Sequence, residues 1–591
     1  MTVYKSPEKE FNFLLNEVFD YASLAALPGF EDATPEMVES VLPEAAKFFE
    51  QVVAPTNQPG DQQGSKLIDG KVKIPDALEG VYPQLVEAGW TALSGDAEYG
   101  GAGFPNVVGL AVQEMLQSSN LGFSLMPMLT QGVVHALDLY GSDEQKETYL
   151  SNLITGHWSG TMNLTEPQAG TDLGAVQTKA VRNGNTYLIS GQKIYITWGD
   201  QEITENVIHL VLARTPDAPE GVKGISMFIV PKYLVNADGS VGERNDVKPV
   251  NVEHKLGIHS SPTCTMMFGE SGGATGYLVG EEGKGLVYMF AMMNAARLAV
   301  GHQGVAVSER AYQQAVWYAR ERVQGAVQGV DGRAPIIHHA DVRRMLMQIR
   351  SMTEAGRALS FKAIFEEDRS FNHPDEAVRA DSARAVELLT PLVKAWCTEM
   401  AMETTSLGVQ VHGGMGFVEE TGAAQFMRDA RILPIYEGTN GIQALDFIGR
   451  KTLRDAGEGM KALAGEMQAD LANIAAHSEL ADLAAAIGDA LAHCQQGAEF
   501  VFTHPHEAGG VAYNYMMLVG NSVCGWLLAK SAAAAQAAIN AGSSDRFYVQ
   551  KIATARFFIE QVLPRNAAYL GAVKAGQAGI MALTEEDFEV A

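Results

Sequence analysis

The chain has 591 residues, 47% of them hydrophobic, and a formal net charge of −27. This length is too great for one compact core, so we expect three or four packed units. The acidic balance excludes a general nucleic-acid-binding protein, which needs a basic surface, although a few arginines and helix N-termini can still hold an anionic cofactor. The four cysteines include no CxxC pair and no histidine partner at ligand spacing, which predicts neither a disulfide framework nor a metal site.

The N-terminal residues MTVYKSPEKEFNF lack the basic region and apolar run of a signal peptide. No stretch approaches about 20 uninterrupted apolar residues, so we expect no membrane span. Both features favour a cytoplasmic protein.

Four regions follow one another along the chain. Residues 1–158 are predicted to be mainly helical, because apolar residues recur three and four positions apart. From 159 to 285 short β-branched runs alternate with Asn-Gly and Asp-Gly turn signals, which is typical of a small antiparallel barrel or sandwich. The helical period returns over 286–454, and residues 455–591 are alanine-rich and helical. The sequence therefore predicts an α+β fold that is mostly α: an N-terminal helical domain, a middle β-domain, a second helical domain and a helical extension.

Common nucleotide-binding motifs are absent from the sequence. Gly283-Lys284 is not part of a phosphate loop, since Leu278 stands at the upstream glycine position and Gly285 replaces the Ser or Thr. No GxGxxG opens a strand-to-helix turn, so a Rossmann domain is not indicated.

Two segments in the β-region carry polar and aromatic groups suited to a ligand. The loop Leu164-Thr-Glu-Pro-Gln-Ala-Gly-Thr-Asp172 is rich in hydroxyl and backbone donors. Tyr195 and Thr197 share one face of a strand begun by Lys193, which places an aromatic ring beside a hydroxyl. Locally, an ordinary loop and a half-buried strand face explain these segments about equally well.

Glu437 is the candidate for acid–base chemistry. It stands in Tyr-Glu-Gly-Thr after the apolar run Ile432-Leu-Pro-Ile, where a carboxylate is hard to place as a solvated charge. Partial desolvation would raise its pKa towards the range of a useful general base. A structural carboxylate at a turn is the local alternative.

Together these segments resemble the acyl-CoA dehydrogenase family, over about residues 85–450. The resemblance implies a helical–β–helical fold with FAD lying between the β-domain and the second helical domain. It also implies that the 164–172 loop and the Tyr195-Ile-Thr197 segment contact the flavin, with tyrosine here in place of the family's tryptophan. The cofactor-binding residues that it implies are Met162, Leu164, Thr165, Thr171, Tyr195, Thr197, Arg322, Gln410, Gly413, Gly414, Thr439 and Asn440.

The resemblance also selects the base. In this family the catalytic glutamate stands either in the YEGT segment or just before an arginine on an earlier helix, and here Ala296 precedes that arginine, Arg297. Glu437 is therefore the base that the resemblance implies, with Thr171, Arg297 and Gly438 as substrate-binding residues. The implied reaction is α,β-dehydrogenation of an acyl-CoA thioester to a trans-2-enoyl-CoA. Glu437 would take the α-proton and flavin N5 the β-hydride.

Partners and substrate follow from the same resemblance. An electron-transfer flavoprotein is expected to accept the electrons, and Arg322 and the Gln410–Gly414 segment imply a homodimer. The chain is similar to long bacterial members, which include 3-(methylthio)propanoyl-CoA dehydrogenases, so a short thioether acyl group and short or medium fatty acyl groups both remain open. An acyl-CoA oxidase and a non-catalytic acyl-CoA-binding paralogue are the alternatives.

The extension carries none of these motifs. Its apolar helices must bury their surface somewhere, and the acidic residues between them disfavour an anionic membrane. We therefore expect the extension to pack on the catalytic core or on its dimer mate.

Overall fold

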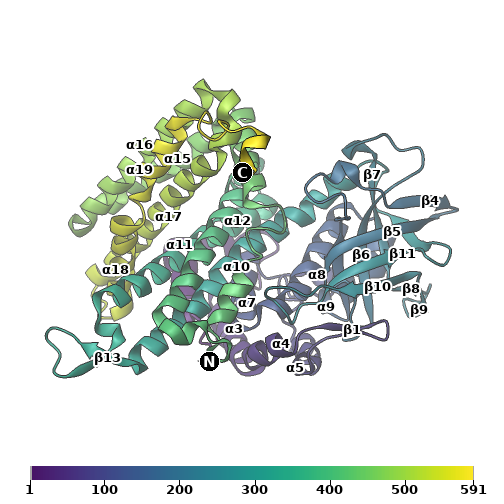
Figure 1. The fold of residues 1–591 in the computed structure, drawn as a ribbon, viewed down its shortest axis with the longest axis horizontal. Helices are drawn as coiled ribbons and strands as arrows, with labels where there is room; N and C mark the ends of the chain where they lie inside the picture. The colour runs from purple at the N-terminus through teal and green to yellow at the C-terminus, as the bar shows by residue number, and fades with distance from the viewer. Residues whose placement is uncertain (1–2, 590–591) are drawn as a thin grey trace. The chain divides into compact units, whose positions relative to one another are not determined.

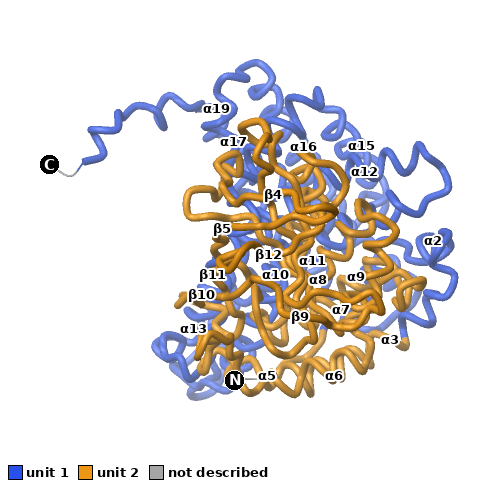
Figure 2. Tube along the Cα trace, turned by 90° about the vertical axis from the view of Figure 1, so that its right-hand side faces the viewer, with its two compact units in different colours: residues 1–2, 7–39, 300–591 blue, residues 3–6, 40–299 orange. Residues whose placement is uncertain are grey.

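The computed structural model describes residues 3–589, which form two compact units (Figures 1 and 2). Unit 2 comprises residues 3–6 and 40–299, and unit 1 comprises residues 7–39 and 300–589. Among the described residues no helix is both long and apolar enough to cross a bilayer.

Unit 2 holds most of the helices of the first region and the whole of the main sheet. The principal helices are α7 (Asn106–Ser119), α8 (Leu121–Tyr140) and α9 (Asp143–Thr155). The strands of the sheet are β3 (Trp158–Asn163), β4 (Lys179–Asn183), β5 (Thr186–Thr197), β6 (Asn206–Arg214), β7 (Ile225–Pro231), β10 (Val247–Val252), β11 (Thr263–Phe268) and β12 (Ala274–Leu278).

The eight strands are hydrogen-bonded in the order β10-β11-β5-β12-β7-β6-β3, with β4 beside β5 and β6. Most pairs are antiparallel, as the turn signals predicted, but β3 runs parallel to β6. β6 and β7 are almost wholly buried, and α8 and α9 pack on β3, which lies beside β6. At Gly160 of β3 an added Cβ would lie 2.7 Å from the Val133 side chain of α8, so glycine permits this close helix–strand contact.

The β5 strand differs from the sequence expectation. It begins at Thr186 rather than at Lys193. A β-bulge interrupts its pairing with β11, since Met266 pairs with Lys193 and Cys264 with Ile196, leaving two residues of β5 opposite one of β11.

Unit 1 is helical. It holds residues 300–321 of α10 (Gly285–Glu321) together with the remaining helices. These are α1 (Glu8–Phe13), α2 (Tyr21–Ala25), α11 (Ala340–Asn372), α12 (Glu376–His412), α13 (Ala423–Ala430), α14 (Asn440–Ile448), α15 (Glu458–Ala475), α16 (Ala481–Thr503), α17 (Ala508–Asn540), α18 (Arg546–Gln561) and α19 (Arg565–Ala575). Gly301 and Gly304 of α10 lie so close to the α12 backbone that an added Cβ would be 2.5 Å from the carbonyl oxygens of Val393 and Cys397.

The helical extension packs inside unit 1, as its apolar helices predicted. α17 contacts α11, α12 and α14, and its Trp526 is fully buried with its indole N–H bonded to Asp470 at 2.9 Å. Trp396 of α12 donates to Asn521 of α17 at 2.7 Å. The apolar surface of the extension is thus covered by the helices that precede it.

The N-terminal helix α1 is also held by the extension. Lys551 of α18 is 1% exposed and donates to Glu10 of α1 at 2.5 Å and to Glu354 of α11 at 2.7 Å. Burial raises the pKa of Glu10, whereas the Lys551 and Arg350 charges outweigh burial and lower that of Glu354. Phe13 packs edge-on against Phe547 of α18 with ring centres 5.3 Å apart.

Candidate active site

The predicted flavin loop, residues 164–172, follows β3 directly in unit 2. Leu164 is buried and Thr165 half-buried, whereas Thr171 is exposed. The Thr165 carbonyl accepts a hydrogen bond from the Ile194 N–H at 2.9 Å, which ties the start of the loop to β5. The loop therefore has one fixed end and presents the Thr171 side chain to solvent.

Glu166 holds the inner side of this loop. Its side chain is 3% exposed and accepts hydrogen bonds from Lys193 at 2.8 Å and from the Thr178 hydroxyl at 2.6 Å, while Lys193 also donates to the Leu164 carbonyl at 2.9 Å. Burial lowers the pKa of Lys193 to about 8 despite the Glu166 charge. For Glu166 burial is outweighed by Lys193 and the other donors, so its pKa is lowered. This buried ion pair determines the shape of the loop.

Tyr195 and Thr197 lie on the outward side of β5. Ile196 and Trp198 are buried, Thr197 is half-buried, and the Tyr195 side chain is 62% exposed. Tyr195 has a left-handed φ of 59°, at the bulge that turns Lys193 to the inside. The predicted pairing of ring and hydroxyl on one face is consistent with this exposure, but the bulge breaks the alternation before Tyr195.

Two further predicted residues of unit 2 lie on regular elements. Met162 is half-buried on β3. Arg297 of α10 is 8% exposed and donates to Asn294 at 3.2 Å. Ala296 is buried beside it, so this helix offers a methyl group where a base would otherwise stand.

Glu437 occupies a tight turn of unit 1 just before α14. It has a φ of 56°, and Gly438 a φ of 86°. A left-handed conformation is unusual for glutamate and is a form of strain that concentrates at functional sites. Of the seven described non-glycine residues with positive φ, Tyr195 and Glu437 are both predicted site residues.

The surroundings of Glu437 are partly apolar. Its side chain is half-buried, and Tyr436 packs against a core cluster that includes Leu433. The Tyr436 hydroxyl bonds to Gln303 of α10. Burial, and then the negative charge of Glu437, raise the pKa of Tyr436 well above its ordinary value. The turn thus combines a carboxylate with a neutral phenol.

The residues after Glu437 have different surroundings. Thr439 is exposed and caps α14 by accepting from the Ile442 N–H at 3.3 Å. Asn440 is 4% exposed, and its side chain is bonded to residues of α12. Gln443 is fully buried and donates to the carbonyls of Glu437 and Gly438 at 3.4 and 3.3 Å.

The predicted diphosphate segment lies at the C-terminal end of α12. Gln410, Gly413 and Gly414 are exposed, and no atom lies within 4 Å of a Cβ built on either glycine. Gly413 has a φ of 59°, which favours glycine. Arg322 is exposed where α10 leads into the hairpin strand β13 (Val323–Ala326).

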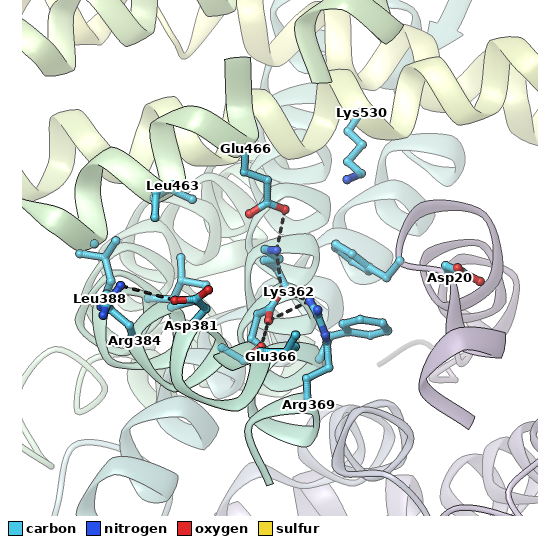
Figure 3. Close-up of a pocket in the computed structure, with 18 of the residues that line it drawn as sticks. Asp20, Lys362, Glu366, Arg369, Asp381, Arg384, Leu388, Leu463, Glu466 and Lys530 are labelled. Atoms are coloured by element: carbon cyan, nitrogen blue, oxygen red, sulfur yellow. Dashed lines mark hydrogen bonds and ion pairs between the residues drawn. The ribbon is translucent and has the colours of Figure 1, made fainter. Parts of the chain in front are cut away.

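A cavity of about 430 Å³ in unit 1 lies apart from these residues (Figure 3). α11, α12, α15 and α17 line it, and none of the predicted site residues does. Its charges neutralise one another: Lys362 bonds to Glu366 at 2.9 Å and to Glu466 at 2.7 Å (Figure 3). This cavity therefore provides no uncompensated group for an anionic substrate.

Comparison with family models identifies the chain. Models of the N-terminal, middle and C-terminal domains of acyl-CoA dehydrogenases match residues 35–157, 161–270 and 283–453. The chain belongs to the acyl-CoA dehydrogenase family. A further model, described as acetyl-CoA dehydrogenase C-terminal like, matches residues 463–584 and covers most of the extension.

Several curated relatives of this acyl-CoA dehydrogenase span nearly its whole length. It is 47% identical to the 3-methylmercaptopropionyl-CoA dehydrogenase of Ruegeria pomeroyi, covering 96% of this chain and 97% of the relative. It is 34% identical to a butyryl-CoA dehydrogenase of Syntrophomonas wolfei, covering 98% of each. It is 35% identical to a broad-specificity linear acyl-CoA dehydrogenase of Mycobacterium tuberculosis over the full length of both.

Solved structures agree on the fold. An acyl-CoA dehydrogenase from Bacillus anthracis, solved with FAD, has a TM-score of 0.74 at 23% identity and covers 96% of this chain and 92% of its own. The butyryl-CoA dehydrogenase of Megasphaera elsdenii has a TM-score of 0.57 at 28% identity over 70% of this chain and 97% of its own. A structure described as an electron transferring flavoprotein of Acidaminococcus fermentans has a TM-score of 0.59 at 27% identity, covering 71% and 98%. The predicted order of helical, β, helical and extension domains is confirmed.

Proposed function

We propose that this acyl-CoA dehydrogenase removes the α-proton of an acyl-CoA thioester with Glu437 and forms a trans-2-enoyl-CoA. The observation that carries the proposal is the Glu437 turn, where a half-buried carboxylate is held in a left-handed conformation. Ala296 at the alternative position has no group that can accept a proton. The Tyr436 phenol remains protonated and does not compete with Glu437 as a base.

FAD is the proposed cofactor, and the chain offers groups that fit it. Tyr195 presents an exposed ring suited to a flat heteroaromatic system, and Thr165, Thr171 and Thr197 add hydroxyls nearby in the sequence. Gly413 and Gly414 leave their backbone open to a diphosphate, and Arg322 supplies a guanidinium. Met162, Leu164, Gln410 and Thr439 remain proposed contacts. When bound, FAD supplies the redox chemistry by accepting the β-hydride at N5.

The chain's own residues account for the rest of the step. Glu437 accepts the α-proton, and Gly438, which has no side chain, allows a thioester to approach the turn. Thr171 and Arg297 are proposed to bind substrate. Asn440 remains a proposed cofactor contact, and its side-chain amide is bonded to residues of α12.

A short thioether acyl-CoA such as 3-methylmercaptopropionyl-CoA is the proposed substrate. The relative named for it shares 47% identity over nearly the whole chain, against 34–35% for relatives named for butyryl or linear acyl groups. Anaerobic flavin bleaching with a matched panel of thioether and straight-chain acyl-CoAs tests this choice. Faster bleaching by butyryl-CoA than by the thioether of similar length would contradict it.

An electron-transfer flavoprotein is the proposed electron acceptor. An acyl-CoA oxidase with the same residues would instead pass electrons to oxygen, so the reduced protein should be mixed in a stopped-flow instrument with either acceptor. Reoxidation by air at the rate of turnover would favour the oxidase. A purified protein without a visible flavin band would favour a non-catalytic acyl-CoA-binding paralogue.

A homodimer is the proposed assembly, with Arg322 completing a partner's cofactor site. Arg322 is exposed and its guanidinium makes only a long contact, 3.4 Å, to Gln324, so its substitution should not disturb folding. Arg322→Ala should lower FAD retention about tenfold through loss of a charged contact while the melting curve of the protein is unchanged. A fully flavinylated monomer in light scattering would contradict the assembly.

Glu437→Gln provides the decisive test of the base. The variant should fold, bind FAD and bind acyl-CoA, but flavin reduction should slow by about 10²–10⁴-fold because no second carboxylate replaces the base. The single-turnover rate of bleaching measures this directly. Retention of more than about a tenth of the wild-type rate would overturn the assignment.

A further inference from the structure

Asn440, the first residue of α14, is held by three side chains of α12. Its Oδ1 accepts from the Lys394 ammonium at 2.9 Å, and its Nδ2 donates to the Glu399 carboxylate at 2.8 Å and to the Thr398 hydroxyl at 3.0 Å. Asn440 is 4% exposed, and Lys394 and Thr398 are fully buried. Because both ends of the amide are bonded, its position and orientation are fixed.

The backbone transmits this position to Glu437. The Asn440 N–H donates to the Pro434 carbonyl at 3.0 Å, which closes residues 434–440 into a loop. Glu437 lies in the middle of that loop with its φ of 56°. A strained residue keeps its conformation only where its surroundings hold the ends of the segment, and Asn440 is one of those ends.

The C-terminal extension reaches the same network. α17 packs along α14, where the Tyr515 and Phe447 rings are 5.7 Å apart. α17 also packs on α12, the helix that supplies the partners of Asn440. The extension therefore contacts both helices that hold the loop carrying Glu437.

We propose that Asn440, Lys394 and Glu399 are positioning residues for the proton-abstraction step, and that the C-terminal extension, through the packing of α17 on α14, takes part in placing Glu437. The proposal rests on Glu437 being the base. Its consequence is that the extension contributes to catalysis as well as to burial of apolar surface.

A single variant at Asn440 and a compensating double variant with Glu399 test the network. Asn440→Asp places a carboxylate against that of Glu399, whereas the double variant Asn440→Asp/Glu399→Gln restores a donor–acceptor pair with its direction reversed. The single variant should slow flavin bleaching about ten- to a hundredfold with substrate KM within about twofold, because misplacement affects the chemical step rather than binding. The double variant should recover to within about threefold of the wild type.

Asn521→Asp is the matched control. Asn521 of α17 is 2% exposed and accepts a hydrogen bond from Trp396 of α12, the helix that also holds Asn440, but it is not bonded to Asn440. The same change of amide to carboxylate there should lower stability while leaving the bleaching rate of the folded protein unchanged. An equal loss of bleaching rate in the control would mean that the effect at Asn440 reflects a general loss of stability, and would overturn the proposal.

Tyr515→Leu and hydrogen exchange complete the test. Removing the α17 ring that packs against Phe447 of α14 should slow bleaching about threefold, and an unchanged rate would exclude the extension from the positioning role. Amide exchange of the 435–443 peptide should quicken in Asn440→Asp and return to the wild-type rate in the double variant. Unchanged bleaching and exchange in Asn440→Asp, with Glu437→Gln inert, would overturn the positioning proposal and leave the base assignment intact. Wild-type bleaching by Glu437→Gln would overturn both.

Discussion

Glu166 in unit 2 and Glu437 in unit 1 both stand in short motifs from which the site was predicted, yet they have different surroundings. Glu166 is buried and bonded to a lysine, a threonine and two backbone N–H groups. Glu437 is half-buried on a strained turn, and the groups that hold the turn are its neighbours Asn440 and Gln443. Glu166 holds its loop through its side chain, whereas the backbone of Glu437 is held by its neighbours. A carboxylate whose acceptor sites are occupied by a lysine, a hydroxyl and backbone N–H groups is a poor base, so Glu166 is not a candidate for that role.

The largest effect on stability is expected from Glu166→Gln. Removing this charge leaves Lys193 buried without its counter-ion, which should lower the free energy of unfolding at pH 7 by roughly 3 kcal/mol. Urea unfolding measures the loss, with Glu437→Gln as the matched control at a half-buried site. A loss below about 0.5 kcal/mol, or an equal loss in the control, would show that the ion pair does not stabilise the loop.

A smaller effect on the free energy of unfolding is expected when the pH is raised, and its direction tests the lowered pKa of Lys193. The pKa of Lys193 is about 8 in the folded protein, and the unfolded chain has the ordinary higher value of a lysine. Between these values the unfolded state binds more protons, so the free energy of unfolding of the wild type should rise with pH relative to Lys193→Met. Below about pH 8 both states are protonated and the difference should be flat.

Urea unfolding of the wild type and Lys193→Met at pH 7.0 and pH 9.5 provides the comparison. A difference that stays flat over this interval would contradict the prediction, because it would mean that Lys193 keeps its proton in the folded protein up to the ordinary lysine range. A fall would mean that the ion pair raises the pKa of Lys193 above that range.

The smallest effect is expected at Gln443. Its amide makes two long hydrogen bonds to the carbonyls of Glu437 and Gly438, and its Oε1 has no hydrogen-bond partner. Gln443→Leu keeps the buried volume and should slow flavin bleaching about threefold, against the much larger loss in Asn440→Asp. A loss as large as that of Asn440→Asp would mean that the carbonyl contacts, rather than the α12 network, hold the turn.

The sequence predicted the residues that face outward better than those that hold them in place. The domain order, and the packing of the extension within unit 1, are confirmed, because helical and β periods and apolar helix faces are local signals. The sequence predicted Lys193 only as the start of a strand. Its partner Glu166 lies 27 residues away, and nothing local predicts the pairing. The side-chain bonds of Asn440 were likewise not predicted, because its α12 partners Lys394 and Glu399 are 46 and 41 residues distant.

The backbone strain at Tyr195 and Glu437 could not be predicted from the sequence either. Tyrosine and glutamate usually avoid left-handed φ, so neither Tyr195 nor Glu437 signals its conformation by residue type. The same holds for the β5 bulge, which depends on pairing with β11 some 70 residues later, as between Ile196 and Cys264. The three two-stranded ribbons outside the main sheet were also not predicted, because their strands are only three or four residues long.

The contact between Glu10 and Lys551 has a consequence for how the protein is made. The two residues are 541 positions apart, and Lys551 is also the partner of Glu354. A ribosome adds about 5–20 residues per second, so Lys551 is synthesised roughly half a minute to two minutes after helix α1. During that time its apolar face, including Phe11 and Phe13, lacks the α18 part of its final packing. A nascent chain therefore needs some other protection for its first helix until translation is nearly finished.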